Sequence, residues 1–426
     1  MERQTEALVT VEKPSRHFLI RASAAVFITY LSMYAFRKPF TAATYEGISF
    51  FNVDYKILLI LAQLAGYTLS KFMGIGIISS LRADQRLARL IQLMCVALSS
   101  LLFFGMTPPP FNIIFMFVNG IPLGLIWGIV FSYIEGRRST ELLGAIMASS
   151  FILSSGIVKA IGSIALEVLH VDEFWMPFLA ASIFIPFLMF GIFLLSGLEP
   201  PEDADRSART ERVTMGKRER KKFKRRFGIG ILLSVLVYMG LTIFRDLRDN
   251  FAVEFWKSSN VSKPTDLLIY TEIPISFTVL AIISLLTLVK QNRIAFFMHF
   301  AIVCVLGFVM LFITFSFRAG QMGSFSWVVL SGFAMYLPYI GYHTFFFERW
   351  IAYFRCKSNA GYLMYTMDAA GYLSSCFILL FRNFGASDVS WVDFFMNMAF
   401  LVGSMMIVLS ILSFIYFRKK PVHEIT

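Results

Sequence analysis

The sequence predicts an all-α membrane protein with twelve transmembrane helices, and three observations lead to this fold class. The first is composition: 57% of the 426 residues are hydrophobic and only 15% are charged, whereas about 25% are charged in a typical soluble domain. The second is the number of apolar segments about 20 residues long, the length that crosses a bilayer as a helix. The third is the placement of Lys and Arg, which gather in alternate loops between these segments.

The apolar segments are arranged as six before and six after a polar stretch at 199–227. Backbone polar groups cannot stay unpaired in lipid, so each segment is expected to be a helix. None has the alternating ten-residue pattern of a barrel strand. We expect an N-terminal six-helix half at 1–198, a basic linker at 199–227 and a C-terminal six-helix half at 228–426. The expected spans are 18–38, 57–80, 88–107, 111–134, 142–166, 174–197, 228–250, 267–289, 294–317, 325–347, 359–381 and 391–417.

The basic residues predict the orientation of the chain. With the N-terminus in the cytoplasm, the cytoplasmic segments hold 28 Lys and Arg residues and the segments on the other side hold 7. Because basic loops stay inside, we expect a cytoplasmic (inner) membrane protein with both termini and the linker in the cytoplasm. The linker is expected to be solvated, to anchor this orientation and to attract anionic lipid headgroups. The expected partners are therefore the lipid bilayer and no nucleic acid, and we expect a monomer.

Motifs of other chemistries are missing from the sequence. No GxxxxGK followed by Ser or Thr is present, so direct use of ATP is not expected. HExxH and GxSxG are missing too, which weighs against a metalloprotease or a hydrolase of the nucleophile-elbow type. The four cysteines include no CxxC pair. We expect no enzyme activity, no cofactor, no metal site and no cleavable signal peptide.

A short repeat links the two predicted halves. Residues 30–37 read YLSMYAFR and residues 238–245 read YMGLTIFR, with Tyr, Phe and Arg at the same spacing in the first helix of each half. A second, weaker repeat ends the fourth and tenth spans, which read Glu135-Gly136-Arg137 and Glu348-Arg349. Both repeats suggest a duplicated six-helix unit. Transporters built from such repeats place the substrate site between the halves, near the middle of the membrane.

Three motifs carry a resemblance to a known family. YAFRKPFTAA, GYTLSKFMGIGIISS and FRDLRDNFAVEFW are similar to the first, second and seventh helices of the organophosphate:phosphate antiporter family, within the major facilitator superfamily. The resemblance implies the major facilitator fold, and it implies that Arg37 and Arg245 bind substrate phosphate. The loop GIGIISSLRADQR departs from the superfamily pattern, because Ser79 or Ser80 stands where an Asp is expected. This departure indicates a divergent branch.

Arg37 and Arg245 are the first candidates for substrate binding. A Lys or Arg inside a span costs about 2.5–3.5 kcal/mol to insert, so it is expected to face a cavity or a partner. Arginine suits an oxyanion because its planar fork binds two oxygens at once. Two readings stay open: both arginines share one anion across a cavity, or both extend outward to the headgroups. Arg245 also has Asp246 beside it and Asp249 one turn further on as competing partners.

Other polar side chains inside the spans complete the expected site. Lys71 is expected in the site or in a gate, and His343 either contacts substrate, carries a proton or is satisfied by a neighbour. Asp368 is expected to be a proton carrier or the counter-ion of a cavity cation, and Asp249 and Glu272 are further candidates for that role. The remaining substrate-binding candidates, for which outward extension or packing is the alternative, are Lys38, Lys159, Arg248, Tyr30, Tyr34, Tyr67, Tyr238 and Trp127.

Charged residues at the inner ends of the fourth, fifth and tenth spans are expected to form a cytoplasmic gate. The alternative is a set of surface pairs, each contributing about 0–1 kcal/mol. These residues are Glu135, Arg137, Arg138, Glu141, Glu348 and Arg349.

The paired halves and the family resemblance predict a secondary transporter that works by rocking two halves, and the excess of cations inside the spans predicts a small organic anion as its substrate. A phosphate ester, exchanged for phosphate, is the favoured substrate class. One alternative is a proton-coupled symporter of an anion or a peptidoglycan fragment, in which Asp368 and His343 carry protons. Another alternative is a membrane sensor or assembly partner that keeps the fold without transport.

Overall fold

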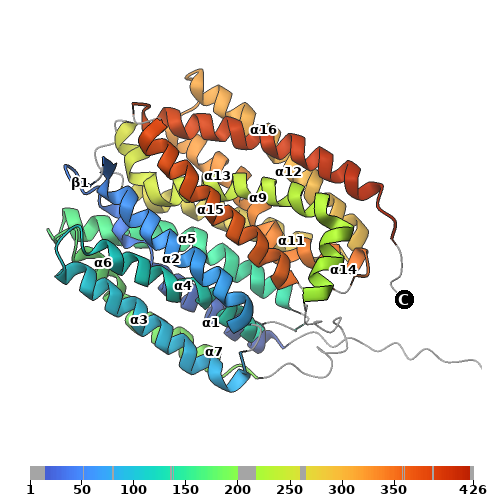
Figure 1. Cartoon of the computed structure of the whole chain (residues 1–426), viewed down its shortest axis with the longest axis horizontal. Helices are drawn as coiled ribbons and strands as arrows, with labels where there is room; N and C mark the ends of the chain where they lie inside the picture. The colour runs from blue at the N-terminus through green and yellow to red at the C-terminus, as the bar shows by residue number, and fades with distance from the viewer. Residues whose placement is uncertain are drawn as a thin grey trace, which may run out of the picture.

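The computed structural model describes residues 15–50, 52–78, 81–134, 137, 139–199, 217–259, 265–356, 358, 360–385 and 388–422. Long helices run side by side through the molecule, and two short antiparallel strands form a hairpin (Figure 1). The all-α membrane fold is confirmed. Its elements are α1 (Arg16–Ala35), η1 (Pro39–Ala42), β1 (Ser49–Phe50), β2 (Val53–Asp54), α2 (Tyr55–Ile77), η2 (Ala83–Gln85), α3 (Arg86–Met106), α4 (Ile113–Ile134), α5 (Thr140–Glu167), α6 (Met176–Ile183), α7 (Ile185–Ser196), α9 (Lys217–Ser258), α10 (Thr265–Tyr270), α11 (Glu272–Leu286), α12 (Asn292–Arg318), α13 (Ser324–Gly341), η3 (Tyr342–Phe346), α14 (Phe347–Tyr353), α15 (Ala360–Gly385) and α16 (Trp391–Arg418).

The helices follow the twelve predicted spans. Ten helices among the described residues are long and apolar enough to cross a membrane, and the pair α6 and α7, bent by 42°, makes an eleventh span. The one remaining predicted span, 325–347, coincides with α13, which continues through the π-helical turn η3 into α14. Each predicted span therefore corresponds to one helix or to consecutive helices.

The helices form two groups. Helices α1–α7 lie together in the blue-to-green part of the molecule, and α9–α16 lie together in the yellow-to-red part (Figure 1). The groups meet where α2 packs on α15 and where α5 packs on α10 and α11. The start of α1 and the end of α16 lie at the same end of the molecule, which we call the terminal end. The hairpin β1–β2 lies at the other end, which we call the opposite end.

Glycines allow α2 and α4 to approach closely. A Cβ at Gly66 would lie 2.1 Å from the carbonyl oxygen of Phe117, and a Cβ at Gly120 would lie 2.1 Å from that of Gln63. Small residues serve this purpose in membranes, because helix association there depends on close packing rather than on exclusion of water. The approach brings Gln63 beside Asn119, and the two amides form a hydrogen bond of 2.8 Å.

Two other long helices, α1 and α9, are interrupted inside the molecule. Helix α1 ends at Ala35, and the chain turns before it continues as η1; α9 has a non-helical residue at Phe251 (φ −125°, ψ 25°). Freed backbone groups are tolerated in a membrane only where they find partners. After α1, Gln63 donates to the carbonyl oxygen of Arg37 at 2.9 Å, and Asn119 donates to that of Phe36 at 3.2 Å. These two amides hold the turn that carries Arg37.

The predicted linker at 199–227 overlaps the start of α9. This helix begins at Lys217 and has a break at Phe227 (φ −118°, ψ 15°), so the last part of the linker is helical. Residues 200–216 lie outside the described parts of the chain. The exact limits of the two halves therefore stay a prediction.

Candidate functional site

A layer of charged side chains crosses the interior where the two groups of helices meet. Charged groups in this position need partners or a cavity, because removing a charge from water is costly. We call the set the charge layer. Its members, all buried except the partly exposed Glu254, are Arg37, Lys38, Lys56, Lys71, Lys159, Arg245, Arg248, Asp246, Asp249, Glu254, Glu272 and Asp368.

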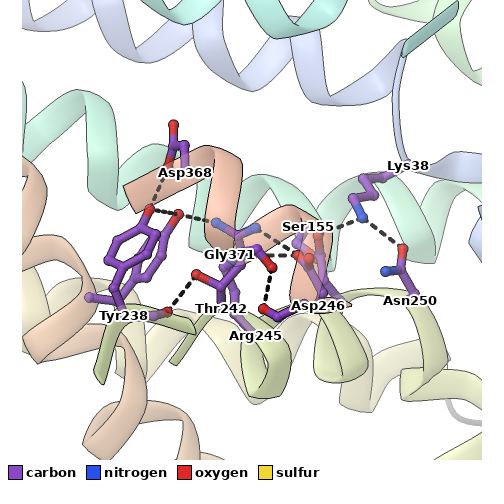
Figure 2. A network of polar contacts seen from close by, with 12 residues as sticks. Lys38, Ser155, Tyr238, Thr242, Arg245, Asp246, Asn250, Asp368 and Gly371 are labelled. Carbon is purple, nitrogen blue, oxygen red and sulfur yellow. Dashed lines mark hydrogen bonds and ion pairs between the residues drawn. The ribbon is translucent and has the colours of Figure 1, made fainter. Parts of the chain in front are cut away.

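Asp249 of α9 connects the two halves on the side of the opposite end. Lys38 Nζ lies 2.8 Å from Asp249 Oδ2, and Lys159 Nζ lies 3.8 Å from Oδ1. The Ser155 hydroxyl also donates to Oδ1. Figure 2 shows Lys38 extending toward Asn250, to which it donates a hydrogen bond of 2.7 Å. Two cations of the N-terminal half thus share one carboxylate of the C-terminal half.

Asp368 of α15 forms a second connection, on the side of the terminal end. Lys71 Nζ of α2 lies 3.0 Å from Asp368 Oδ2, and the Tyr238 hydroxyl donates to Oδ1. His343 Nε2 lies 2.7 Å from the same hydroxyl and 3.9 Å from Oδ1. The structure therefore brings together four of the residues expected from the sequence. It makes Asp368 the counter-ion of Lys71 in this conformation.

Two further ion pairs lie within the C-terminal half. Arg245 Nη2 and Nε lie 2.7 and 3.1 Å from Oδ1 of Asp246, and the guanidinium also donates to the Tyr339 hydroxyl. Arg248 Nη2 and Nε lie 3.0 and 3.3 Å from Oε1 of Glu272. Of the two partners that the sequence left open for Arg245, the structure selects the adjacent aspartate.

Arg37 differs from the other cations of the charge layer. Among the described residues no carboxylate forms an ion pair with it, whereas each of the other six has one. Its guanidinium lies 4.3 Å from the ring centroid of Tyr67 and 5.8 Å from that of Tyr34. Its Nε is buried without a hydrogen-bond partner. The layer holds 7 cations and 5 carboxylates, so two positive charges are in excess.

A small polar pocket lies beside Arg37, and both halves contribute to it. The second oxygen of Asp246, Oδ2, is buried and has no hydrogen-bond partner. A pocket in which Arg and Lys donors come together can bind an oxyanion. We call it the anion pocket; its lining residues are Arg37, Lys38, Ile60, Gln63, Leu64, Tyr67, Asp246 and Asn250.

A pair of tyrosine rings stands between the two arginines of the repeat. Arg37 lies over Tyr67, whose ring centroid is 4.7 Å from that of Tyr372, and Arg245 lies 5.2 Å from the Tyr372 centroid. Arg37 and Arg245 are each 5% exposed, so protein encloses both of them and neither extends to the surface. In this conformation Arg245 does not line the anion pocket; it reaches the pocket through Asp246.

A second cavity lies on the terminal side of the charge layer, between α2 and α4 of one half and η3, α14 and α15 of the other. Along α2 the order from the opposite end is Gln63, Tyr67, Lys71 and then Ile78, which lines this cavity. The Tyr67–Tyr372 and Lys71–Asp368 contacts therefore separate the anion pocket from it. We call it the terminal cavity; its lining includes Trp127, Phe131, His343, Thr344, Glu348 and Tyr365.

Contacts between the halves close the opposite end. Lys56 of α2 forms an ion pair with Glu254 of α9, and Lys257 Nζ lies 2.9 Å from Glu46. Asn383 of α15 donates to the backbone oxygen of Asn52, beside the hairpin, at 3.0 Å. The anion pocket is thus shut off from the opposite end by these contacts, and the Tyr67–Tyr372 and Lys71–Asp368 contacts separate it from the terminal cavity.

Of the expected gate residues, the structure describes Arg137, Glu141, Glu348 and Arg349, which lie at the helix ends on the side of the terminal end. Glu141 of α5 and Arg349 of α14 form an ion pair of 3.1 Å between the halves. Arg137 donates to the Tyr133 carbonyl at 3.3 Å within the N-terminal half, and Glu348 lines the terminal cavity. Outside the described residues lie Glu135, Arg138, Ser79 and Ser80.

The aromatic candidates other than Tyr67 and Tyr238, whose contacts are given above, divide between packing and the terminal cavity. Tyr30 and Tyr34 are buried side by side, with ring centroids 5.8 Å apart, and neither lines one of the two spaces described above. Trp127 stacks on Phe131 at 4.8 Å and lies 5.9 Å from His343, so it contributes to the wall of the terminal cavity.

Several site residues were missed by sequence reasoning. Gln63, Asn119 and Asn250 orient the turn after α1 and the end of Lys38. An amide inside an apolar span is costly unless it is bonded, and this signal could have identified the first two. Ser155 and Tyr372 had no comparable signal, because Ser and Tyr are common in membrane helices. Within the described parts of the chain no cluster of His, Cys, Asp and Glu is placed to hold a metal ion.

This fold is shared with transporters of the major facilitator superfamily. A D-xylose–proton symporter has a TM-score of 0.61 at 14% identity, over 93% of this chain and 96% of that one. The proton:xylose symporter XylE bound to 6-bromo-6-deoxy-D-glucose gives 0.60 at 14% identity, over 96% and 97%. The nucleoside transporter NupG gives 0.60 at 12% identity, over 94% and 100%. The protein is therefore a multi-pass membrane protein with the major facilitator fold.

A comparison of the sequence with protein families identifies the family of the chain. Over residues 39–420 the sequence matches the family described as "Family of unknown function (DUF5690)", and the chain belongs to this family. No curated protein matches the sequence.

Proposed function

We propose that the protein is a secondary transporter that moves a small organic anion, a phosphate ester, across the cytoplasmic membrane by alternating access between its two halves. The observation that carries the proposal is the excess of two positive charges in the charge layer, together with an Arg37 that no described carboxylate neutralises. A phosphate monoester near neutral pH carries nearly two negative charges, which would balance this excess.

The anion pocket would bind the phosphate through Arg37 and Lys38. The guanidinium fork can bind two phosphate oxygens at once, while the lysine acts as a point charge. Lys38 now contacts Asp249 and Asn250 of the C-terminal half. An anion that takes Lys38 from Asp249 would weaken a connection that closes the opposite end. Binding would thereby shift the population toward the state in which this end opens.

Exchange for phosphate is the favoured coupling. It agrees with the resemblance of the first, second and seventh helices to the organophosphate:phosphate antiporter family. It also agrees with the closed opposite end, since a transporter that opens only when an anion occupies the pocket exchanges one anion for another. The orientation follows from the 28-to-7 excess of basic residues, with the terminal end in the cytoplasm.

The orientation can be tested at the two ends of α12. Gln291 and Gln321 are exposed just before and just after this helix. In a background without other cysteines, an impermeant maleimide applied to intact cells should label Gln321→Cys and spare Gln291→Cys. Labelling in the reverse sense would overturn the proposed orientation.

Transport can be tested by counterflow. Proteoliposomes loaded with phosphate should take up labelled phosphate, and external sn-glycerol 3-phosphate or another phosphate ester should compete. Arg37→Gln should abolish this uptake, whereas Arg382→Gln, a buried arginine outside the charge layer, should retain it. Binding of phosphate without flux in wild type would contradict transport and favour a sensor on the same fold.

Proton-coupled symport is the second candidate, and the Asp368 cluster favours it. Asp368, Tyr238 and His343 form a continuous chain of contacts, and His343 lines the terminal cavity. If Asp368 carries a proton, Asp368→Asn should abolish uptake driven by a pH gradient and leave exchange intact. If it only neutralises Lys71, both modes should fall.

A further inference from the structure

Two buried polar atoms without partners belong to residues that line the anion pocket. One is Nε of Arg37, a donor, and the other is Oδ2 of Asp246, an acceptor. Asp246 is 3% exposed, and Oδ1 of the same carboxylate is already bound by two nitrogens of Arg245. A buried acceptor without a partner is costly, so its presence beside a ligand pocket points to a group that the ligand supplies.

We propose that Asp246 recognises a hydroxyl group of the transported anion, so that the substrate is a hydroxylated phosphate ester. This inference rests on the function proposed above and specifies its substrate. The phosphate would take Arg37 and Lys38, from the N-terminal half, and the hydroxyl would donate to Oδ2 of Asp246, from the C-terminal half. One substrate would then contact both halves through two different groups.

The surroundings of Asp246 hold its carboxylate in place for this role. Arg245 binds one oxygen and is itself bonded to Tyr339, so neither partner can turn away without losing a buried contact. Because Arg245 binds Oδ1, the other oxygen of this carboxylate, Oδ2, is the one left free to accept a hydrogen bond. In this way the second arginine of the repeat acts as a positioning residue, because it orients the aspartate that contacts the substrate.

A hydroxyl fits the charge balance better than an ammonium group. The layer has two positive charges in excess, which a phosphate dianion with a neutral hydroxyl balances. An ammonium on the same molecule would leave one charge uncompensated inside the membrane, where that is costly. A site built around a hydroxyl also discriminates strongly against the analogue that lacks it, because the buried acceptor is then left unpaired.

The test compares ligands that differ in one group. Binding to the full-length protein in nanodiscs is measured by calorimetry for propyl phosphate, 2-hydroxypropyl phosphate, 3-hydroxypropyl phosphate and 3-aminopropyl phosphate. In wild type at least one hydroxylated ester should bind tenfold or more tightly than propyl phosphate, in the range of a hydrogen bond to a charged group. In Asp246→Asn this ratio should fall severalfold, since the amide oxygen will be drawn to Arg245 and the NH2 group can offer the hydroxyl only a neutral hydrogen bond in place of one to a charged acceptor.

The controls separate the inference from the function on which it rests. Asp266→Asn removes an exposed negative charge outside the charge layer and the pocket, so it should leave the ratio unchanged. If the esters bind and Arg37→Gln weakens them all, but the wild-type ratio is about one, the inference is wrong and the proposed function stands. A preference for the aminopropyl ester would likewise contradict the proposal that Asp246 recognises a hydroxyl group. If wild type binds none of the esters, the function and the inference fail together. The wild-type series decides the matter even if Asp246→Asn does not fold.

Discussion

The two copies of the Tyr-x5-Phe-Arg repeat match in sequence and differ in structure. In the first copy, Arg37 lies in the turn after α1, and the next residue is Lys38. In the second copy, Arg245 lies in the helical part of α9 between the breaks at Phe227 and Phe251, and the next residue is Asp246, which pairs with it. One copy therefore carries two positive charges, whereas the other is neutral. A single position, the residue after the arginine, separates a side chain available to an anion from one that is already neutralised.

This difference assigns different roles to the two halves. Under the proposed function, the N-terminal half would supply the charge that attracts an anion, and the C-terminal half would supply the carboxylates, Asp246 and Asp249, that compete with the anion or contact its other groups. A symmetric pair of arginines would bind an anion equally from both sides. The asymmetric pair leaves one side with acceptors, which permits selection among anions.

The largest expected effect distinguishes the two arginines by stability. Arg245→Gln leaves Asp246 buried without its cation, so the free energy of unfolding should fall by about 3–5 kcal/mol. Arg37→Gln leaves no carboxylate without its ion-pair partner, so the free energy of unfolding should fall much less. Thermal unfolding in detergent measures both variants, and the double change Arg245→Gln with Asp246→Asn should recover most of the loss. Equal losses of stability for the two single variants would contradict the difference between a paired Arg245 and an unpaired Arg37.

The next effect concerns the geometry of Arg37. Arg37→Lys keeps the charge and loses the fork, so phosphate affinity should drop about 10- to 150-fold, the equivalent of 1.5–3 kcal/mol for a charged hydrogen bond. Arg382→Lys is the matched control and should bind normally. If Arg245 comes to share the same anion during the cycle, the double change Arg37→Lys with Arg245→Lys should cost less than the sum of the single changes. Full additivity would limit Arg245 to positioning Asp246.

Lys38 should matter less than Arg37, because it is a point charge that Asp249 already engages. Lys38→Met should reduce phosphate affinity by about tenfold, the lower end of the range for a charged hydrogen bond. Calorimetry measures this change, with Lys257→Met, a surface lysine at the opposite end, as the control. An unchanged affinity would place the anion on Arg37 alone.

The smallest effect is expected at the terminal end. Glu141 and Arg349 form a partly exposed pair, so Glu141→Gln should change the free energy of unfolding by about 0–1 kcal/mol. If this ion pair is a gate, breaking it should also make the terminal cavity more accessible to reagents. Thr344→Cys in the terminal cavity should react with a thiol reagent several times faster in the Glu141→Gln background. An unchanged rate would make the Glu141–Arg349 contact an ordinary surface pair.

Sequence reasoning predicted the fold more completely than the site. Apolar length and basic loops are local properties of the chain, and they placed all twelve spans on helices. The cost of a charge inside a span singled out Lys71, Lys159, Arg245, Arg248 and Asp368, and the structure places each of them in the charge layer. The repeat and the family resemblance pointed to Arg37. Those signals identify which residues need a partner, but they do not identify the partner.

Partners depend on how helices distant in the sequence pack together. Lys71 and Asp368 are nearly 300 residues apart in the sequence, and only the packing of α2 on α15 makes them an ion pair. Sequence spacing left Asp246 and Asp249 as equal choices for Arg245, and the fold decided between them because Lys38 and Lys159 of the other half occupy Asp249. The sequence by itself determined a helical membrane protein whose spans contain several cations that need partners, because an unpaired charge inside a membrane is costly. The tertiary structure alone decided which cation stays unpaired, because the carboxylates that neutralise the others are brought within a few ångströms only when the two halves meet.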